Sequence, residues 1–186
     1  MAISVPTKMT VRKNPHHLQI TRKWFDVSYA FFTPVIIAYD VFWFPYSYHW
    51  YISASAAPNS DTFSFLFPLL SDLLIIASNY ALMTVFLNTT TISVTSNVIS
   101  VKHGPLPVWR KKRVASKEVL QLYCKKENYW NKFFWDSSFS VEAVMNNKKN
   151  ITLLFNLKIA EQALFIKQEI EKFLNIEDKP VKGEFK

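Results

Sequence analysis

The sequence predicts a membrane-inserted helical hairpin followed by a mainly-β domain that ends in one amphipathic helix. Two observations predict the hairpin: long apolar runs cover residues 24–46 and 63–87, and the whole segment 24–87 contains no Lys or Arg. The β domain is predicted because apolar and polar residues alternate from residue 88 onward, as they do along half-buried strands. The chain has 186 residues and a formal net charge of +8, and its cations lie on either side of the apolar segment.

Both apolar runs reach the length of about 20 residues that a transmembrane helix requires. The first contains Pro34 and Asp40, and the second contains Asp72 and Asn79. An Asp near the centre of such a helix costs roughly 2.5–3.5 kcal/mol on insertion scales, which the surrounding Phe, Ile, Val and Trp residues offset. Intramembrane polar residues usually contact other polar groups. We therefore predict that Asp40, Asp72 and Asn79 are intramembrane helix contacts, with ion or proton transport by an oligomer as the alternative.

The distribution of charge predicts the topology. Residues 1–23 form a basic segment with five cations and no acid, the connecting loop has no Lys or Arg, and 17 cations follow the second run. By the positive-inside rule, both termini face the cytoplasm and the Tyr- and Trp-rich loop faces outward, across the cell inner membrane. The alternative is a secretory signal cleaved near Ala54-Ser55-Ala56, against which stand a basic start of more than twenty residues and the interruption by Asp40.

Short alternating segments predict the strands of the β domain, residues 88–175. These segments are residues 91–95, 98–102, 119–125, 139–145 and 151–155, and a period of three to four residues predicts a helix over residues 157–175. Antiparallel strands closed by one C-terminal helix outline a pleckstrin-homology-like (PH-like) barrel, with a smaller α+β sheet packed on one helix as the alternative. Residues 176–186 are expected to form a polar, extended tail.

Several sequence blocks support this outline together. They are Arg22-Lys23-Trp24-Phe25, residues 88–94, His103-Gly104-Pro105-Leu106-Pro107, Gln121-Leu122-Tyr123-Cys124, residues 162–166 and residues 176–184. With these blocks the chain resembles a family of bacterial two-helix membrane proteins that carry a PH-like cytoplasmic domain. The resemblance implies location and fold but no activity. The chain departs from the family in lacking the N-terminal zinc ribbon of some members, and a basic cluster replaces the Gly-containing turn that often follows Pro107.

That basic cluster is the main candidate for ligand binding. Trp109, Arg110, Lys111, Lys112 and Arg113 follow one another directly. Each Lys or Arg close to an anionic membrane contributes about 1 kcal/mol, and Trp favours the headgroup layer. We predict that these five residues bind anionic lipid headgroups; the alternative is a solvated loop whose charges only reinforce the topology.

The remaining composition argues against an enzyme. Two glycines and one cysteine in the whole chain exclude Gly-rich phosphate loops and Cys-rich zinc sites. We expect no cofactor, no metal site and no nucleic-acid partner. The aromatic run 129–135 either enters the bilayer, binds a protein or closes the core. The predicted function is non-enzymatic: a membrane-anchored interaction or scaffolding protein that contacts anionic lipid and a protein partner. The alternatives are an accessory subunit of a larger membrane complex and a small oligomeric transporter or channel.

Overall fold

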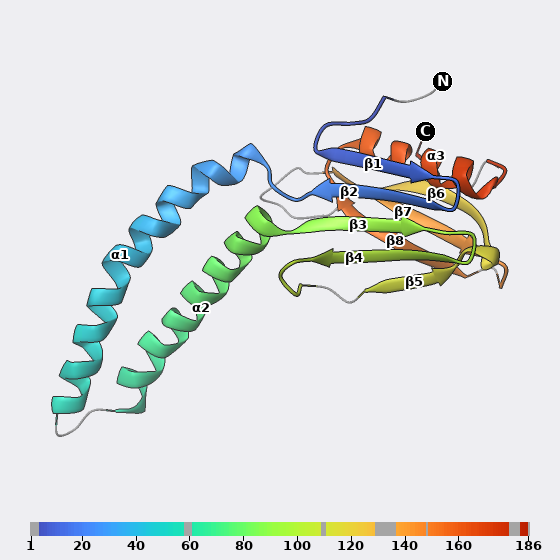
Figure 1. The fold of residues 1–186 in the computed structure, drawn as a ribbon. Coiled ribbons are helices and arrows are strands. Elements are labelled where there is room, and N and C mark those ends of the chain that lie inside the picture. Colours follow the sequence, from blue (N-terminus) through green and yellow to red (C-terminus); the bar gives the residue numbers. More distant parts are fainter. Residues whose placement is uncertain are drawn as a thin grey trace. The chain divides into compact units, whose positions relative to one another are not determined.

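The computed structural model describes residues 4–57, 61–108, 111–128, 137–147, 149–178 and 183–185. The chain divides into two compact units: residues 24–88 form a helical unit, and residues 1–23 and 89–186 together form a β unit. Figure 1 labels the elements of both units. The helical unit is therefore an insertion in the chain of the β unit.

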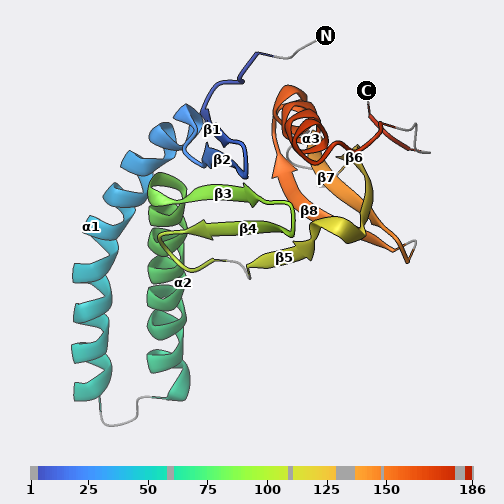
Figure 2. The same ribbon diagram turned by 45° about the vertical axis from the view of Figure 1, so that its right-hand side comes forward.

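The helical unit consists of α1 (Val27–Ala56) and α2 (Thr62–Leu87), which run side by side in both ribbon views (Figures 1 and 2). At 1.5 Å per residue, the two helices are about 45 and 39 Å long. Asp61 caps α2, because its carboxylate accepts a hydrogen bond from the Ser64 amide at 3.0 Å. Each helix also continues through internal proline, at Pro34 and Pro45 in α1 and at Pro68 in α2.

Within the described residues, α2 is the one helix that is long and apolar enough to cross a membrane by length and composition. Helix α1 is longer, but its many Tyr, Trp, Ser and Pro residues make it less apolar. On this criterion, the expected pair of membrane-spanning helices is supported at α2 only.

The first sheet of the β unit has five antiparallel strands in the order β1-β2-β3-β4-β5. The strands are β1 (Met9–Asn14), β2 (His17–Lys23), β3 (Thr89–Val94), β4 (Val98–Gly104) and β5 (Lys112–Ala115). Strands β2 and β3 pair with each other from Leu18↔Val94 to Lys23↔Thr89, although residues 24–88 separate them in the sequence. Strands β1 and β2 were not expected in the basic N-terminal segment. Leu18 and Ile20 alternate with polar neighbours there, and both are fully buried.

The second sheet has three antiparallel strands, β6 (Val119–Asn128), β7 (Ser137–Met145) and β8 (Asn150–Leu157), in that order. A short 3-10 turn, η1 (Ser116–Glu118), joins β5 to β6, and α3 (Ala160–Leu174) follows β8. These elements confirm the strands predicted at residues 91–95, 98–102, 119–125, 139–145 and 151–155, together with the C-terminal helix. Asn175 ends α3 in the left-handed conformation, which stops the helix.

The two sheets face each other across one apolar core, with α3 beside them (Figure 2). Helix α3 contacts both sheets: the Gln162 side-chain amide donates to the Thr7 carbonyl beside β1, and α3 packs on β6 and β7. The expected closed barrel is wrong, because the described strands form two separate sheets.

Candidate functional site: a polar helical seam and a basic sheet face

The helical unit has hydrogen-bonded polar side chains between its two helices. Trp43 Nε1 and the Tyr51 hydroxyl, both on α1, donate to the two carboxylate oxygens of Asp72 on α2, at 2.7 and 3.1 Å. Asn79 Nδ2 on α2 donates to Asp40 Oδ2 on α1 at 2.9 Å. The structure therefore brings all three predicted contact residues, Asp40, Asp72 and Asn79, to the interface within one hairpin. Trp43 and Tyr51, which complete this polar seam, were not predicted from the sequence as hydrogen-bond partners.

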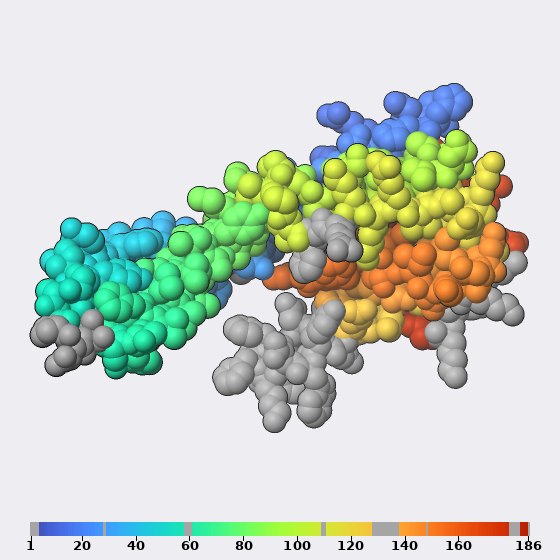
Figure 3. Space-filling model, turned by 90° about the horizontal axis from the view of Figure 1, so that it is seen from below, coloured from blue at the N-terminus to red at the C-terminus, as the bar shows by residue number. Residues whose placement is uncertain are grey.

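Large apolar side chains cover the outside of the same unit, coloured cyan to green in Figure 3. Phe31, Phe42 and Leu74 keep 76, 77 and 69% of their surface exposed. Others that are similarly exposed are Phe32, Val35, Ile37, Val41, Phe63, Leu70, Leu73, Ile76, Met83 and Leu87. Water-soluble proteins rarely expose continuous apolar surface on this scale. The outside of the helical unit is therefore suited to an apolar solvent.

A groove of ≈ 320 Å³ lies between α1 and α2 beside Asp40. Its walls are mainly apolar, with Ser71 and Ser78 as the small polar members. Each of these serine hydroxyls donates to a carbonyl of its own helix. Asp40 Oδ1 is buried and has no hydrogen-bond partner among the described residues. A buried carboxylate oxygen without a donor is costly, so this position favours a further hydrogen-bond donor.

Successive side chains of β5 point to opposite faces of the sheet, so the residues of the basic cluster do not all lie on the same face. Lys111 and Arg113 are exposed, whereas Lys112 is half-buried. Lys112 Nζ donates to the Thr152 carbonyl of β8 at 2.5 Å and lies 5.7 Å from the centre of the Phe155 ring. In Figure 3 the yellow-green surface of β4 and β5 accordingly lies against the orange surface of the second sheet. Lys112 thus links the two sheets. The other two predicted members of the cluster, Trp109 and Arg110, lie outside the described residues.

Strand pairing adds residues that the sequence analysis did not connect with this cluster. Arg113 pairs with Ser100 on β4, and the same row continues across β3 and β2 to Arg12 on β1. Lys102 lies in the neighbouring row, opposite Thr91. Arg12, Lys102 and Arg113 are all exposed on the face turned away from the core. Their common face follows from alternation and register, but the register of β1 and β2 was missed.

A buried ion cluster holds the chain near its C-terminus. Lys167 of α3 is 4% exposed, and its Nζ lies 2.5 Å from Glu184 and 2.7 Å from Asp178. Burial alone lowers the pKa of Lys167, but hydrogen bonds to these two carboxylates reverse the direction and raise it. Glu171 lies 3.9 Å from the same ammonium. Burial raises the pKa of Glu171 to about 7 despite the attraction of Lys167.

The segment 183–185 also covers the edge of β6. The Phe185 amide donates to the Cys124 carbonyl at 2.7 Å, and the Phe185 and Phe139 rings lie 4.9 Å apart. Cys124 is fully buried, and burial raises the pKa of its thiol to about 12. This cysteine is therefore a structural residue, because a reactive thiol needs exposure and a lowered pKa.

Two further polar pairs lie inside the β unit. The Tyr123 hydroxyl donates to Glu142 across β6 and β7, and burial together with this bond raises the Tyr123 pKa. Thr90 Oγ1 and His103 Nδ1 are 2.9 Å apart. Burial, and then the nearby cations Lys112 and Arg22, lower the pKa of His103. Each pair satisfies polar groups next to the core.

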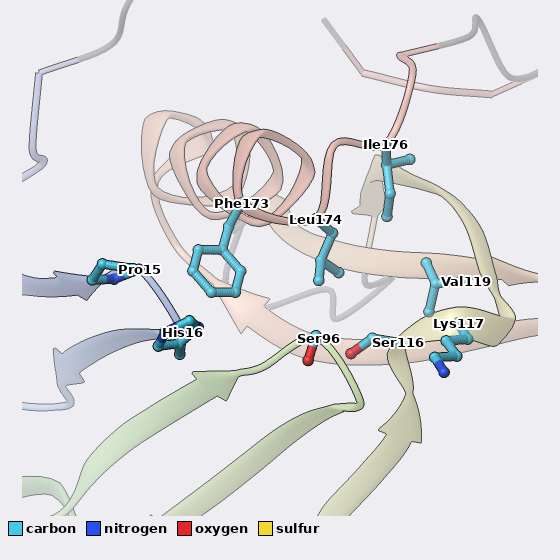
Figure 4. A pocket seen from close by; sticks show the side chains of 9 residues that line it. All are labelled: Pro15, His16, Ser96, Ser116, Lys117, Val119, Phe173, Leu174 and Ile176. Carbon is cyan, nitrogen blue, oxygen red and sulfur yellow. The ribbon is translucent and has the colours of Figure 1, made fainter.

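A surface pocket of ≈ 400 Å³ lies beside the C-terminal end of α3 (Figure 4). The β1–β2 and β3–β4 turns, η1 and the end of α3 contribute its walls. Figure 4 shows Phe173 and Leu174 on the helix side and Ser96, Ser116 and Lys117 on the opposite side. In the part of the chain that the structure describes, no group of three or more His, Cys, Asp or Glu residues is placed to hold a metal ion.

Comparison with known proteins adds no relative: no protein-family model matches the chain, and no curated protein matches its sequence.

Proposed function

We propose that this protein is a membrane-anchored interaction protein without enzymatic activity. The hairpin of α1 and α2 lies in the cell inner membrane, with both chain termini in the cytoplasm. The β unit is then held at the membrane surface, where it contacts anionic lipid and a protein partner. Its two facing sheets with a C-terminal helix are compatible with the PH-like architecture and with the family resemblance of the sequence.

One observation carries the membrane assignment. The helical unit places two of its four carboxylates, Asp40 and Asp72, at the interface of the two helices and exposes Phe, Leu, Ile and Val on its outside. In hydrocarbon, polar groups must find partners inside the protein, whereas apolar side chains are solvated by lipid tails. Helix α2 meets the length and composition of a membrane span. The absence of Lys and Arg from residues 24–87 supports the same assignment for α1.

Membrane extraction tests this function. We expect the full chain to stay in the membrane pellet after washing with alkaline carbonate and to enter solution only with detergent. A matched variant, Phe42→Glu with Leu74→Glu, places two charges on the outside of the hairpin and should reduce membrane retention strongly. Release of the unaltered chain by carbonate would show a peripheral protein and contradict the proposal.

The groove at Asp40 favours a second candidate function, an accessory subunit of a membrane complex. A partner transmembrane helix that presents a hydrogen-bond donor would satisfy Asp40 Oδ1, and Ser71 and Ser78 leave room for close approach. Photo-crosslinking from position 74, on the groove wall, should then yield a discrete adduct that Asp40→Leu abolishes. The same adduct pattern with and without Asp40 would contradict this second function.

A further inference from the structure

The five-stranded sheet is basic throughout. Residues 4–23 and 89–115, which contain all five strands, include no Asp or Glu. The acids of the β unit belong instead to the second sheet, α3 and the segments around them. The net positive charge of the chain is therefore concentrated in the segments that form this sheet.

Strand register sorts the residues of this sheet onto two faces. The inner face carries the buried core residues, among them Leu18, Ile92 and Val101. The outer face carries two parallel polar rows, which cross the sheet from β1 toward β5. The first row is Arg12, Gln19, Ser93, Ser100 and Arg113, of which Ser100 is itself buried; the second is Thr10, Thr21, Thr91 and Lys102. Lys111 and Lys23 are also exposed, at the ends of β5 and β2.

The chemistry of this face matches a layer of phosphate groups. Arg and Lys pair with phosphate oxygens, and Ser and Thr hydroxyls donate hydrogen bonds to them. Strands β1–β5 contain no Phe, Tyr or Trp, so the face has no platform on which the bases of single-stranded nucleic acid would stack. Protein interfaces usually have an aromatic or apolar centre, which this face also lacks. A broad array of cations and hydroxyls is suited to bind an extended anionic surface rather than a small ligand that fills a pocket.

The connections between the sheet and the helices indicate which phosphate surface this face would meet, namely that of the membrane that holds the hairpin. Strands β2 and β3 run directly into the helices: residues 24–26 join β2 to α1, and residue 88 joins α2 to β3. We propose that the outer face of the five-stranded sheet docks onto the phosphate headgroups of an anionic bilayer, with Arg12, Lys102 and Arg113 as its principal contacts. This inference rests on the proposed membrane anchoring. It extends lipid contact from one loop to a face assembled from β1, β4 and β5.

The test uses the full chain in lipid nanodiscs, either of neutral phosphatidylcholine or with about one third anionic phosphatidylglycerol. Because native Cys124 is buried, a fluorophore can be attached selectively at Thr10→Cys, on the outer face. A second labelled protein carries Leu120→Cys, on an exposed position of β6. Lipids with a spin label on the headgroup quench a fluorophore that touches the bilayer surface.

We expect quenching at position 10 in anionic nanodiscs at low salt, little in neutral ones, and little at position 120. The triple variant Arg12→Gln, Lys102→Gln, Arg113→Gln should weaken docking by about 100-fold. Each removed charge contributes about 1 kcal/mol, which is a factor of about five in the docking equilibrium. A control with the same charge change, Lys117→Gln, Lys125→Gln, Lys126→Gln, removes exposed cations outside this face and should keep the quenching.

Any of the following results would overturn the inference. Equal quenching in neutral and anionic nanodiscs, or quenching unaffected by the triple variant, would mean that these cations do not bind headgroups. If position 10 is not quenched in anionic nanodiscs, and the chain binds a short RNA duplex that the triple variant does not bind, the face is a nucleic-acid surface instead. If the chain co-elutes with both kinds of nanodisc but shows no quenching, the docking of the sheet is contradicted and the membrane anchoring is not. A chain that fails to co-elute with neutral nanodiscs contradicts the anchoring as well.

Discussion

The two units of this protein have opposite distributions of polarity. In the β unit, fully buried Leu18, Ile92 and Ile166 form the core while cations and hydroxyls face outward. In the helical unit, Asp40 and Asp72 lie between the helices while Phe31 and Phe42 face outward. This contrast supports the proposal of two solvents for one chain, water for the β unit and lipid for the helical unit.

Both units nevertheless pair a charged side chain with polar side chains from another segment. Asp72 accepts bonds from two side chains of the opposite helix, and Lys167 donates to two carboxylates of the C-terminal segment. The difference lies in the cost of losing a partner. Removing the partner of a buried charge in the core of a water-soluble domain costs much stability, because no other group nearby pairs with the charge. The cost is smaller for helices in a membrane, because they can repack so that the polar group finds another partner.

The largest effect is expected from separating the two units. Lys23 and Thr89 are paired neighbours in the first sheet, so an Asn-Gly turn can join β2 to β3 in place of residues 24–88. We expect the shortened chain to be soluble without detergent and to keep its β-rich far-ultraviolet circular dichroism. Sedimentation checks the first point. A shortened chain that is folded yet remains in the membrane fraction would place the anchor elsewhere.

Removing the buried ammonium of the β unit should be the next largest effect. Lys167→Met leaves Glu171 and Glu184 buried without their cation, and we expect a loss of about 3–5 kcal/mol in the free energy of unfolding. Urea denaturation of the shortened chain measures it. Lys172→Met, on the exposed side of the same helix, is the control and should change stability little. Equal effects of the two substitutions would refute the role of the ion cluster.

Stability of the β unit should also depend on pH through Glu171. Burial raises its pKa from an ordinary 4.5 to about 7, so between these values the folded chain holds a proton that the unfolded chain releases. Stability from this group is complete below pH 4.5 and is lost as the pH rises through 7, by about 3 kcal/mol. Glu171→Gln should remove this slope. Chemical denaturation measures the free energy of unfolding of the unaltered chain and of Glu171→Gln against pH. If the two curves are parallel, Glu171 is not the origin of the slope.

The smallest effect is expected within the helical seam. Asp72→Ala leaves the Trp43 and Tyr51 donors without an acceptor, and we expect the hairpin to lose about 1 kcal/mol of stability in detergent. Ser78→Ala, which removes a hydroxyl bonded to its own helix, is the matched control. Titration with a denaturing detergent, followed by Trp fluorescence, compares them. A larger loss for Ser78→Ala would mean that the seam does not hold the helices together.

Local pattern was enough to predict part of this fold. The alternation around Ile92, Val101 and Leu122 predicted β3, β4 and β6, because the inward positions of these strands are apolar. It did not reveal β1 and β2, where Arg12, Lys13 and Arg22 dominate the composition and Leu18 and Ile20 are the main apolar signal. The pairing of β2 with β3 spans the helical insertion, so no local signal specifies it.

The same limit applies to the candidate sites. Asp40, Asp72 and Asn79 were identified from the sequence because acids are rare in apolar runs, and the structure adds their partners. The inward direction of Lys112 and the common face of Arg12, Lys102 and Arg113 depend on strand register. Register across four strand pairs cannot be derived from residue order when one of those pairs joins segments so far apart.

The most direct test of the two-solvent account is the accessibility of each unit across a membrane. Cysteine is introduced at Ala57, in the turn between α1 and α2, or at Asn147, in the turn between β7 and β8; native Cys124 is buried. A membrane-impermeant maleimide is applied to right-side-out and inside-out vesicles of bacterial inner membrane. The account predicts that position 57 reacts only in right-side-out vesicles and position 147 only in inside-out vesicles. Reaction of both positions from the same side would show that the helical unit does not cross the membrane and would contradict the account.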